Sequence, residues 1–249
     1  MYKSFDEMKT ELLQRERYTI SIAIAHDREI LKTVRQIYEN DFAKVIMVGD
    51  GHKIRNLMNE MEFECSAQIV DCTDEQEAVL EAVRLVRENK AQVLMKGMVN
   101  SSIFLRGVLN ADVGLRQDRL LSHLAAFEIP GESKIAYHSD GGMVAYPGVE
   151  EKKQIIINGL EALCKLGIEN PKVAILAANE TVTSKMPTTV DAAELVQMRN
   201  RGDIPIGILE GPIAMDVAVR RTSAECKKID SKISGDVDLF IMPDIDAGN

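Results

Sequence analysis

The feature that most constrains this fold is a series of short apolar segments that alternate with helical patterns. Examples are 18-YTISIAIA-25, 44-KVIMVG-49 and 92-QVLMKG-97, each followed by a stretch with apolar residues at helical spacing. A strand that is apolar at nearly every position is buried on both faces, as happens when helices cover both sides of a parallel sheet. The sequence therefore predicts an α/β protein with mostly parallel sheets.

The alternation is interrupted near the middle of the chain. Segments 120–129 and 134–139, joined by a Pro-Gly-Glu-Ser turn, have the pattern of an antiparallel hairpin. Beyond residue 140 the strand–helix alternation resumes. We therefore expect two α/β lobes, residues 1–139 and 140–249, with a cleft between them.

Composition narrows the classes of partner. The net charge of −9 argues against nucleic acid, whose protein partners present a basic face. The charged N-terminus lacks the apolar core of a signal peptide, and the chain has no apolar run long enough to span a bilayer. Neither the cysteines nor the histidines show metal-ligand spacing. We expect a cytoplasmic protein without a membrane segment or a metal.

Polar residues collect where the segment 92–97 passes into the next helix. Lys96 ends the strand, Asn100, Ser101 and Ser102 begin the helix, and Arg106 follows one turn later. Hydroxyls and free backbone N–H groups at a helix N-terminus suit a phosphate oxygen, and an arginine adds a bidentate partner. The alternative, that Ser101 is only an N-cap and Arg106 a solvated side chain, is about equally compatible with this spacing.

Further candidates follow strands of the second expected lobe. A hydroxyl-rich loop contains Glu180 and Lys185 and leads into a helix at Thr188, which again suits an anion or an ordinary capped loop. Asp140 precedes a Gly-Gly pair that suits either close backbone approach or a simple turn. Asp216 lies at an expected helix start, where it is either a site acid or a dipole-compensating residue. Motifs of dinucleotide-binding, P-loop and serine-hydrolase proteins are absent from the sequence.

Taken in order, several long stretches resemble the phosphate acetyl/butyryltransferase family, and within it the phosphate butyryltransferase branch. The resemblance extends from about residue 15 to the end of the chain. The stretches that carry it are LMKGMVNSSIFLRGVLN, RLLSHLAAFEIPG, SDGGMVAYPGVEEKKQI, KMPTTVDAAEL, LEGPIAMDVAV and VDLFIMPDIDAGN.

The resemblance implies a fold similar to that of isocitrate and isopropylmalate dehydrogenases and a homodimer. It implies that acyl-CoA and phosphate are interconverted with acyl phosphate and CoA, without a metal or prosthetic group. Arg106 matches the family's anion-binding arginine, and Ser101 and Ser102 match its hydroxyl pair. Lys185 and Thr188 are expected on the opposite wall of the cleft. Butyryl-CoA is the expected acyl donor, and acetyl-CoA remains an alternative because pocket volume cannot be read from sequence.

The resemblance also implies that catalytic residues of the family lie beyond Asn249. A Ser-Arg pair and an acidic residue that resembles a thiol base follow this point in the family, and the sequence contains no Ser-Arg pair. We therefore expect negligible turnover from residues 1–249 alone, and a protein that binds CoA or phosphate without turnover is the alternative. A dehydrogenase activity is disfavoured, because an arginine-rich carboxylate site and paired metal-binding aspartates are not evident in the sequence.

Overall fold

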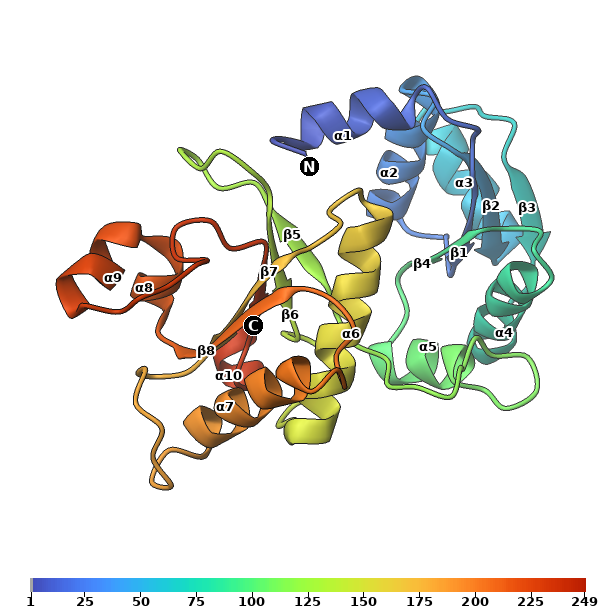
Figure 1. The fold of residues 1–249 in the computed structure, drawn as a ribbon. Coiled ribbons are helices and arrows are strands. Elements are labelled where there is room, and N and C mark those ends of the chain that lie inside the picture. Colours follow the sequence, from blue (N-terminus) through green and yellow to red (C-terminus); the bar gives the residue numbers. More distant parts are fainter. Residues whose placement is uncertain (1) are drawn as a thin grey trace. The chain divides into compact units, whose positions relative to one another are not determined.

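A computed structural model describes residues 2–249, and its internal contacts divide the chain into two compact units. The N-terminal unit is Lys9–Asp118, and the C-terminal unit consists of Arg119–Asn249 with the residues up to Met8. Each unit contains its own sheet (Figure 1). The predicted α/β class with two mostly parallel sheets is confirmed.

The N-terminal unit is a parallel sheet with strand order β3-β2-β1-β4 and helices on both faces. Ile22 and Met47 pack under α2 and α3, whereas Ala23 and Val48, which point to the other face, pack under α4 and α5. This is why these strands are apolar at nearly every position. Helix α1 (Phe5–Leu12) begins in the C-terminal unit and ends in this one, because the boundary falls after Met8. The other elements are β1 (Thr19–Ala23), α2 (Arg28–Glu39), β2 (Lys44–Gly49), α3 (Gly51–Glu60), β3 (Gln68–Asp71), α4 (Glu75–Arg87), β4 (Val93–Lys96) and α5 (Ser101–Val108).

The C-terminal unit has the strand order β5-β6-β9-β7-β8, in which β5 pairs antiparallel to β6 and the other pairs are parallel. Val173 and Ile175 face the core that contains α6 and α7, and Ala174 and Leu176 face the core that contains α8 and α9. The elements are β5 (Ala125–Phe127), β6 (Ala136–Ser139), α6 (Val149–Lys165), β7 (Lys172–Leu176), α7 (Pro187–Asn200), β8 (Ile208–Ile213), α8 (Met215–Val219), α9 (Arg221–Lys227), β9 (Leu239–Ile241) and α10 (Ile245–Gly248).

The antiparallel hairpin is confirmed, but it belongs to the C-terminal unit. Tyr137 of β6 pairs with Leu239 of β9, so the hairpin continues the second sheet. The change of unit consequently falls between Asp118 and Arg119, earlier than the boundary expected after residue 139. Within residues 2–249, none of the helices combines the length and apolarity needed to cross a membrane.

Candidate functional site

In the N-terminal unit, the candidate site lies at the carboxyl end of the parallel sheet. The chain runs from β1 outward to β2 and β3, then returns to place β4 on the other side of β1. Ligands of open α/β sheets bind at such a switch point, outside the carboxyl ends of the strands. Lys96 and the start of α5 follow β4 directly, so the sheet order places them at this position.

The first turn of α5 is closed by an amide rather than by a serine. The Asn100 Oδ1 atom accepts hydrogen bonds from the backbone N–H of Ser102 at 2.9 Å and from its hydroxyl at 2.8 Å. Asn100 is therefore the N-cap, and the alternative with Ser101 as N-cap is wrong. Among residues 2–249, the hydroxyl and backbone N–H of Ser101 and the ammonium of Lys96 have no hydrogen-bond partner. These exposed donors are available to an anion.

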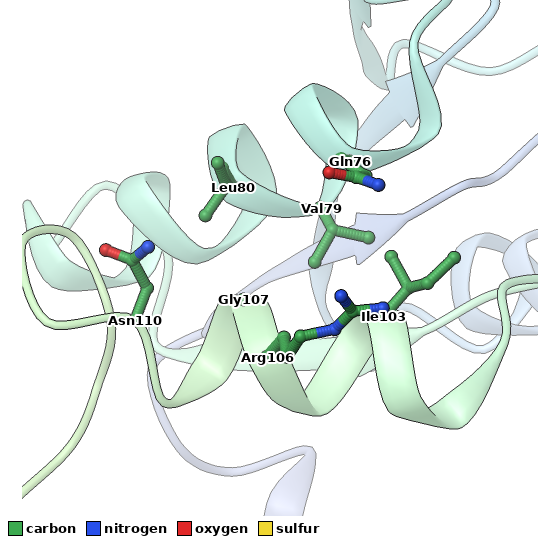
Figure 2. A pocket seen from close by; sticks show the side chains of 7 residues that line it. All are labelled: Gln76, Val79, Leu80, Ile103, Arg106, Gly107 and Asn110. Atoms are coloured by element: carbon green, nitrogen blue, oxygen red, sulfur yellow. The ribbon is translucent and has the colours of Figure 1, made fainter.

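Arg106 extends back along α5 toward this turn. Its Nε donates to the Ser102 carbonyl oxygen at 3.4 Å, and the guanidinium approaches Ile103 (Figure 2). The side chain borders a pocket of about 200 Å³ between α4 and α5. Its lining residues are Gln76, Val79, Leu80, Ile103, Arg106, Gly107 and Asn110. The structure thus brings Arg106 and Ser102 together, with the terminal guanidinium nitrogens left for another partner.

The other helices that follow strands in this unit begin with a carboxylate. Asp27 caps α2, Asp50 caps α3 and Asp74 caps α4, each by accepting backbone N–H groups. At α3 a second carboxylate, that of Asp71, also accepts the Gly51 N–H at 2.8 Å. Carboxylates occupy the positive ends of these helices, whereas the N-cap of α5 is neutral.

In the C-terminal unit, the loop between β7 and α7 contains the other expected anion-binding residues. Lys185 is exposed, and Thr188 lies in the first turn of α7, which begins with Pro187. The neighbouring Thr189, rather than Thr188, is the residue that orders the loop. Its buried hydroxyl accepts the Thr183 N–H at 3.0 Å and donates to the Met186 carbonyl at 2.7 Å. Within the described part of the chain, the N-cap of α7 makes no side-chain capping bond.

Asp140 is buried and holds the backbone around it. Its carboxylate accepts the N–H groups of His123, Gly142 and Met143 at 2.9, 2.7 and 2.8 Å. Three of the roughly four acceptor directions of a carboxylate are therefore occupied. This geometry favours a turn-forming role, which was one of the two interpretations of this position.

Glu180 and Asp216 are brought together by a lysine that the sequence did not indicate. Lys227 of α9 donates to Glu180 at 3.1 Å and to Asp216 at 3.0 Å. The hydrogen bond from Lys227 lowers the pKa of Asp216, and the two carboxylates raise the pKa of Lys227. No signal could have revealed this cluster, because the three residues lie on different elements. Across residues 2–249, no three His, Cys, Asp or Glu side chains gather in a metal-binding arrangement.

Comparison with known proteins identifies the family. Residues 73–249 match the family described as phosphate acetyl/butaryl transferase. The whole chain aligns with 83% of a phosphate butyryltransferase from Clostridium acetobutylicum at 37% identity. The chain belongs to the phosphate acetyl/butyryltransferase family.

Solved structures agree with this membership. A branched-chain phosphotransacylase from Enterococcus faecalis V583 is 31% identical and superimposes with a TM-score of 0.82, covering 93% of this chain and 81% of its own. A 4-hydroxythreonine-4-phosphate dehydrogenase from Klebsiella pneumoniae, 10% identical with a TM-score of 0.60, matches 94% of this chain and 83% of its own. The latter likeness concerns the fold alone, and it confirms the expected dehydrogenase-like architecture of this phosphate acyltransferase family member.

Proposed function

We propose that this chain transfers an acyl group between CoA and inorganic phosphate, with butyryl-CoA as the acyl donor. A phosphate oxygen attacks the thioester carbonyl carbon, the C–S bond breaks, and the phosphate proton passes to the departing thiolate. The products are acyl phosphate and CoA. The choice of butyryl-CoA rests on the resemblance to phosphate butyryltransferases, and acetyl-CoA is the alternative that the family description leaves open.

The observation that carries this proposal is the neutral start of α5 beside carboxylate-capped helices. A dianion needs N–H donors and cations that no carboxylate already neutralises. We propose that Ser101, Lys96 and Arg106 hold a phosphate group there, either inorganic phosphate or a phosphate of CoA. Ser102 joins them by turning its hydroxyl from Asn100 to the bound phosphate. Asn100 contributes by closing the turn without adding negative charge.

We assign a second anion-binding role to Lys185 and Thr188 at the start of α7. Support comes from the exposed lysine and from a helix N-terminus that lacks a capping carboxylate in the described residues. For Asp140, Glu180 and Asp216 we propose structural roles, because each carboxylate is engaged by backbone donors or by Lys227.

A coupled assay of CoA release tests the proposed reaction. The chain is incubated with phosphate and either butyryl-CoA or acetyl-CoA, and CoA binding is measured in parallel by calorimetry. The proposal predicts release of CoA with a higher kcat/KM for butyryl-CoA than for acetyl-CoA, a result that would contradict the negligible turnover expected from the sequence of residues 1–249. A preference for acetyl-CoA would assign the alternative substrate, and CoA binding without release would assign a binding protein.

We also propose that the chain forms a homodimer through the partly covered face of the second sheet. Four large apolar side chains are exposed there: Phe127 (45%), Ile129 (43%), Met215 (43%) and Val219 (38%). Three of them line a pocket of about 130 Å³ between the hairpin and α8. Contiguous apolar surface of this kind typically marks an interface.

Two charged side chains of opposite sign lie beside this apolar surface. Glu132 lies near the hairpin tip and Arg221 begins α9, beside the pocket residue Gly235. Neither side chain has an ion-pair partner within residues 2–249. In an interface with two-fold symmetry, each acidic rim can face the basic rim of the other copy.

Charge reversal tests this interface by light scattering. Glu132→Arg and Arg221→Glu should each yield monomers, and a mixture of the two should yield heterodimers because both cross-interface pairs are then opposite in charge. Val219→Glu should also yield monomers, while Val190→Glu, at an exposed valine on α7, should not. Dimers that persist in all single variants would place the interface elsewhere.

A further inference from the structure

His26 is held in a fixed orientation at the carboxyl end of the sheet in the N-terminal unit. It follows β1, and its Nδ1 accepts the backbone N–H of Asp50 at 3.2 Å. Gly49 lies directly beside the ring with a φ of +150°, and a Cβ atom at Gly49 would come within 2.8 Å of the His26 Nδ1. The neighbouring strand end thus leaves space for the imidazole and fixes its orientation.

The hydrogen bond from Asp50 determines which ring nitrogen of His26 carries the proton. Since Nδ1 accepts a hydrogen bond, the neutral ring of His26 bears its hydrogen on Nε2. Burial and the positive charge of Lys53 lower the pKa of His26, which favours the neutral ring. In residues 2–249 the Nε2–H has no hydrogen-bond partner, and the side chain is only partly buried.

The loop that carries His26 is joined to the loop that carries the candidate anion site. The Met98 N–H donates to the Ile24 carbonyl at 3.1 Å, and Gly97 packs directly on the same backbone. His26 lies two residues after Ile24, and Asn100 lies two residues after Met98. An extended ligand with an anionic group at the start of α5 can therefore reach His26.

The charges around His26 disfavour a phosphate at this position. The carboxylates of Asp27, Asp50 and Glu75 act on the ring, with Lys53 as the neighbouring cation. Such surroundings suit a neutral acceptor, such as an amide carbonyl or a hydroxyl oxygen. CoA carries groups of this kind in the pantetheine arm between its phosphates and its thiol.

We propose that the Nε2–H of His26 donates a hydrogen bond to a neutral oxygen of the pantetheine arm of CoA. This assignment rests on the proposed function and adds a binding residue for one of its two substrates. His26 contributes to the affinity for acyl-CoA and CoA and leaves that for inorganic phosphate unchanged.

Two substitutions separate the two hydrogen bonds of the His26 ring, the bond from the Asp50 N–H and the proposed bond to CoA. His26→Asn places an acceptor where Nδ1 lies, which keeps the bond from Asp50, and removes the distal donor. His26→Gln keeps a donor at the place of Nε2 and loses the acceptor for Asp50. His26→Asn should raise the KM for acyl-CoA and the Kd for CoA about three- to tenfold, the effect of one neutral hydrogen bond. Its KM for phosphate and its thermal stability should match those of the wild type.

His26→Gln should show the converse, a lower unfolding temperature with CoA affinity close to that of the wild type. The assignment would be overturned if His26→Asn and the wild-type protein had equal CoA affinity. It would also be overturned if His26→Asn and His26→Gln lost CoA affinity equally. Should either variant fail to fold, nitrogen NMR of the wild-type histidine gives an independent measurement. CoA should shift the His26 Nε2 resonance and phosphate should not, and the absence of a shift with CoA overturns the proposal.

Arg106→Ala distinguishes this assignment from the proposed function. The His26 assignment alone is wrong if the wild-type protein binds CoA and Arg106→Ala weakens this binding, whereas His26→Asn leaves it unchanged. If the wild type neither binds CoA nor releases it from acyl-CoA, both proposals are wrong.

Discussion

Helices α3 and α5 both follow a parallel strand of the same sheet, yet their N-termini differ in charge. At α3 the carboxylates of Asp50 and Asp71 accept the first backbone N–H groups. At α5 the neutral amide of Asn100 has this role, with Lys96 and Arg106 nearby. The two helix ends have the same dipole, but one is already neutralised and the other is available. We therefore propose that the capping residue determines which of these two helix N-termini binds an anion.

The largest expected effect comes from making α5 resemble α3. Asn100→Asp keeps a good N-cap and adds one negative charge, so thermal stability should not fall. A carboxylate about 5 Å from a bound phosphate repels it by roughly 3 kcal/mol per charge pair at an effective dielectric constant of about 20. Steady-state kinetics should show a loss of at least about a hundredfold in kcat/KM, for inorganic phosphate or for acyl-CoA according to which phosphate group the site holds. Asp50→Asn, the reverse change at α3, is the control and should leave these kinetics unaltered.

Arg106→Ala should have the next largest effect. Hydrogen bonds to charged groups contribute about 1.5–3 kcal/mol, so we expect kcat/KM to fall about ten- to hundredfold while the protein remains folded. The matched control is Arg84→Ala, at an arginine of α4 that pairs with Glu81. Wild-type kinetics in a folded Arg106→Ala protein would remove Arg106 from the anion site.

The comparison can be extended to α7 with a smaller expected effect. Thr188→Glu places a carboxylate in the first turn, which stabilises the helix slightly and should lower kcat/KM about fivefold. Gln197→Glu makes the same charge change near the other end of α7 and should leave kinetics unchanged. Protection of residues 179–188 from hydrogen exchange on adding CoA or phosphate would provide an independent measurement. Equal kinetics in the two variants would exclude α7 from anion binding.

The smallest expected effect is a different response to pH of the two N-caps, Asp50 of α3 and Asn100 of α5. Hydrogen bonding from Lys53 holds the pKa of Asp50 below its ordinary 3.8. A carboxylate with a lowered folded-state pKa stabilises the fold above its unfolded pKa, and this contribution is lost as the pH falls through the folded value. Between about pH 5 and pH 2, the Lys53 amide should lose protection from hydrogen exchange after correction for intrinsic rates. The Ser102 amide, capped by Asn100, should not lose protection through this cap, because an amide does not titrate.

Local patterns predicted the sheets and the polar turn, whereas contacts distant in sequence could not be predicted. The apolar strands indicated the α/β class because burial on both faces is recorded in each strand separately. The boundary between the units depended on the pairing of Tyr137 with Leu239, which no local pattern records. Lys227 joins Glu180 and Asp216 only in the folded chain.

Errors in capping had a different origin. Three polar residues stand in succession at the start of α5, and their spacing does not decide which of them closes the first turn. Thus Asn100 caps α5 where Ser101 was considered. His26 shows the same limit, because the hydrogen bond that fixes its ring comes from a residue on the next strand.

Gly107 shows that the candidate anion site also depends on the apolar contact between α5 and α4. It is buried where α5 packs on α4, and a Cβ atom there would collide with Val79 (Figure 2). Any side chain at Gly107 would displace α5, and with it Arg106 and the turn that we propose binds phosphate. In a mutational scan, loss of activity should therefore extend to this apolar contact as well as to the polar residues. An engineer who wishes to vary the chemistry of the turn should leave its support at Gly107 untouched.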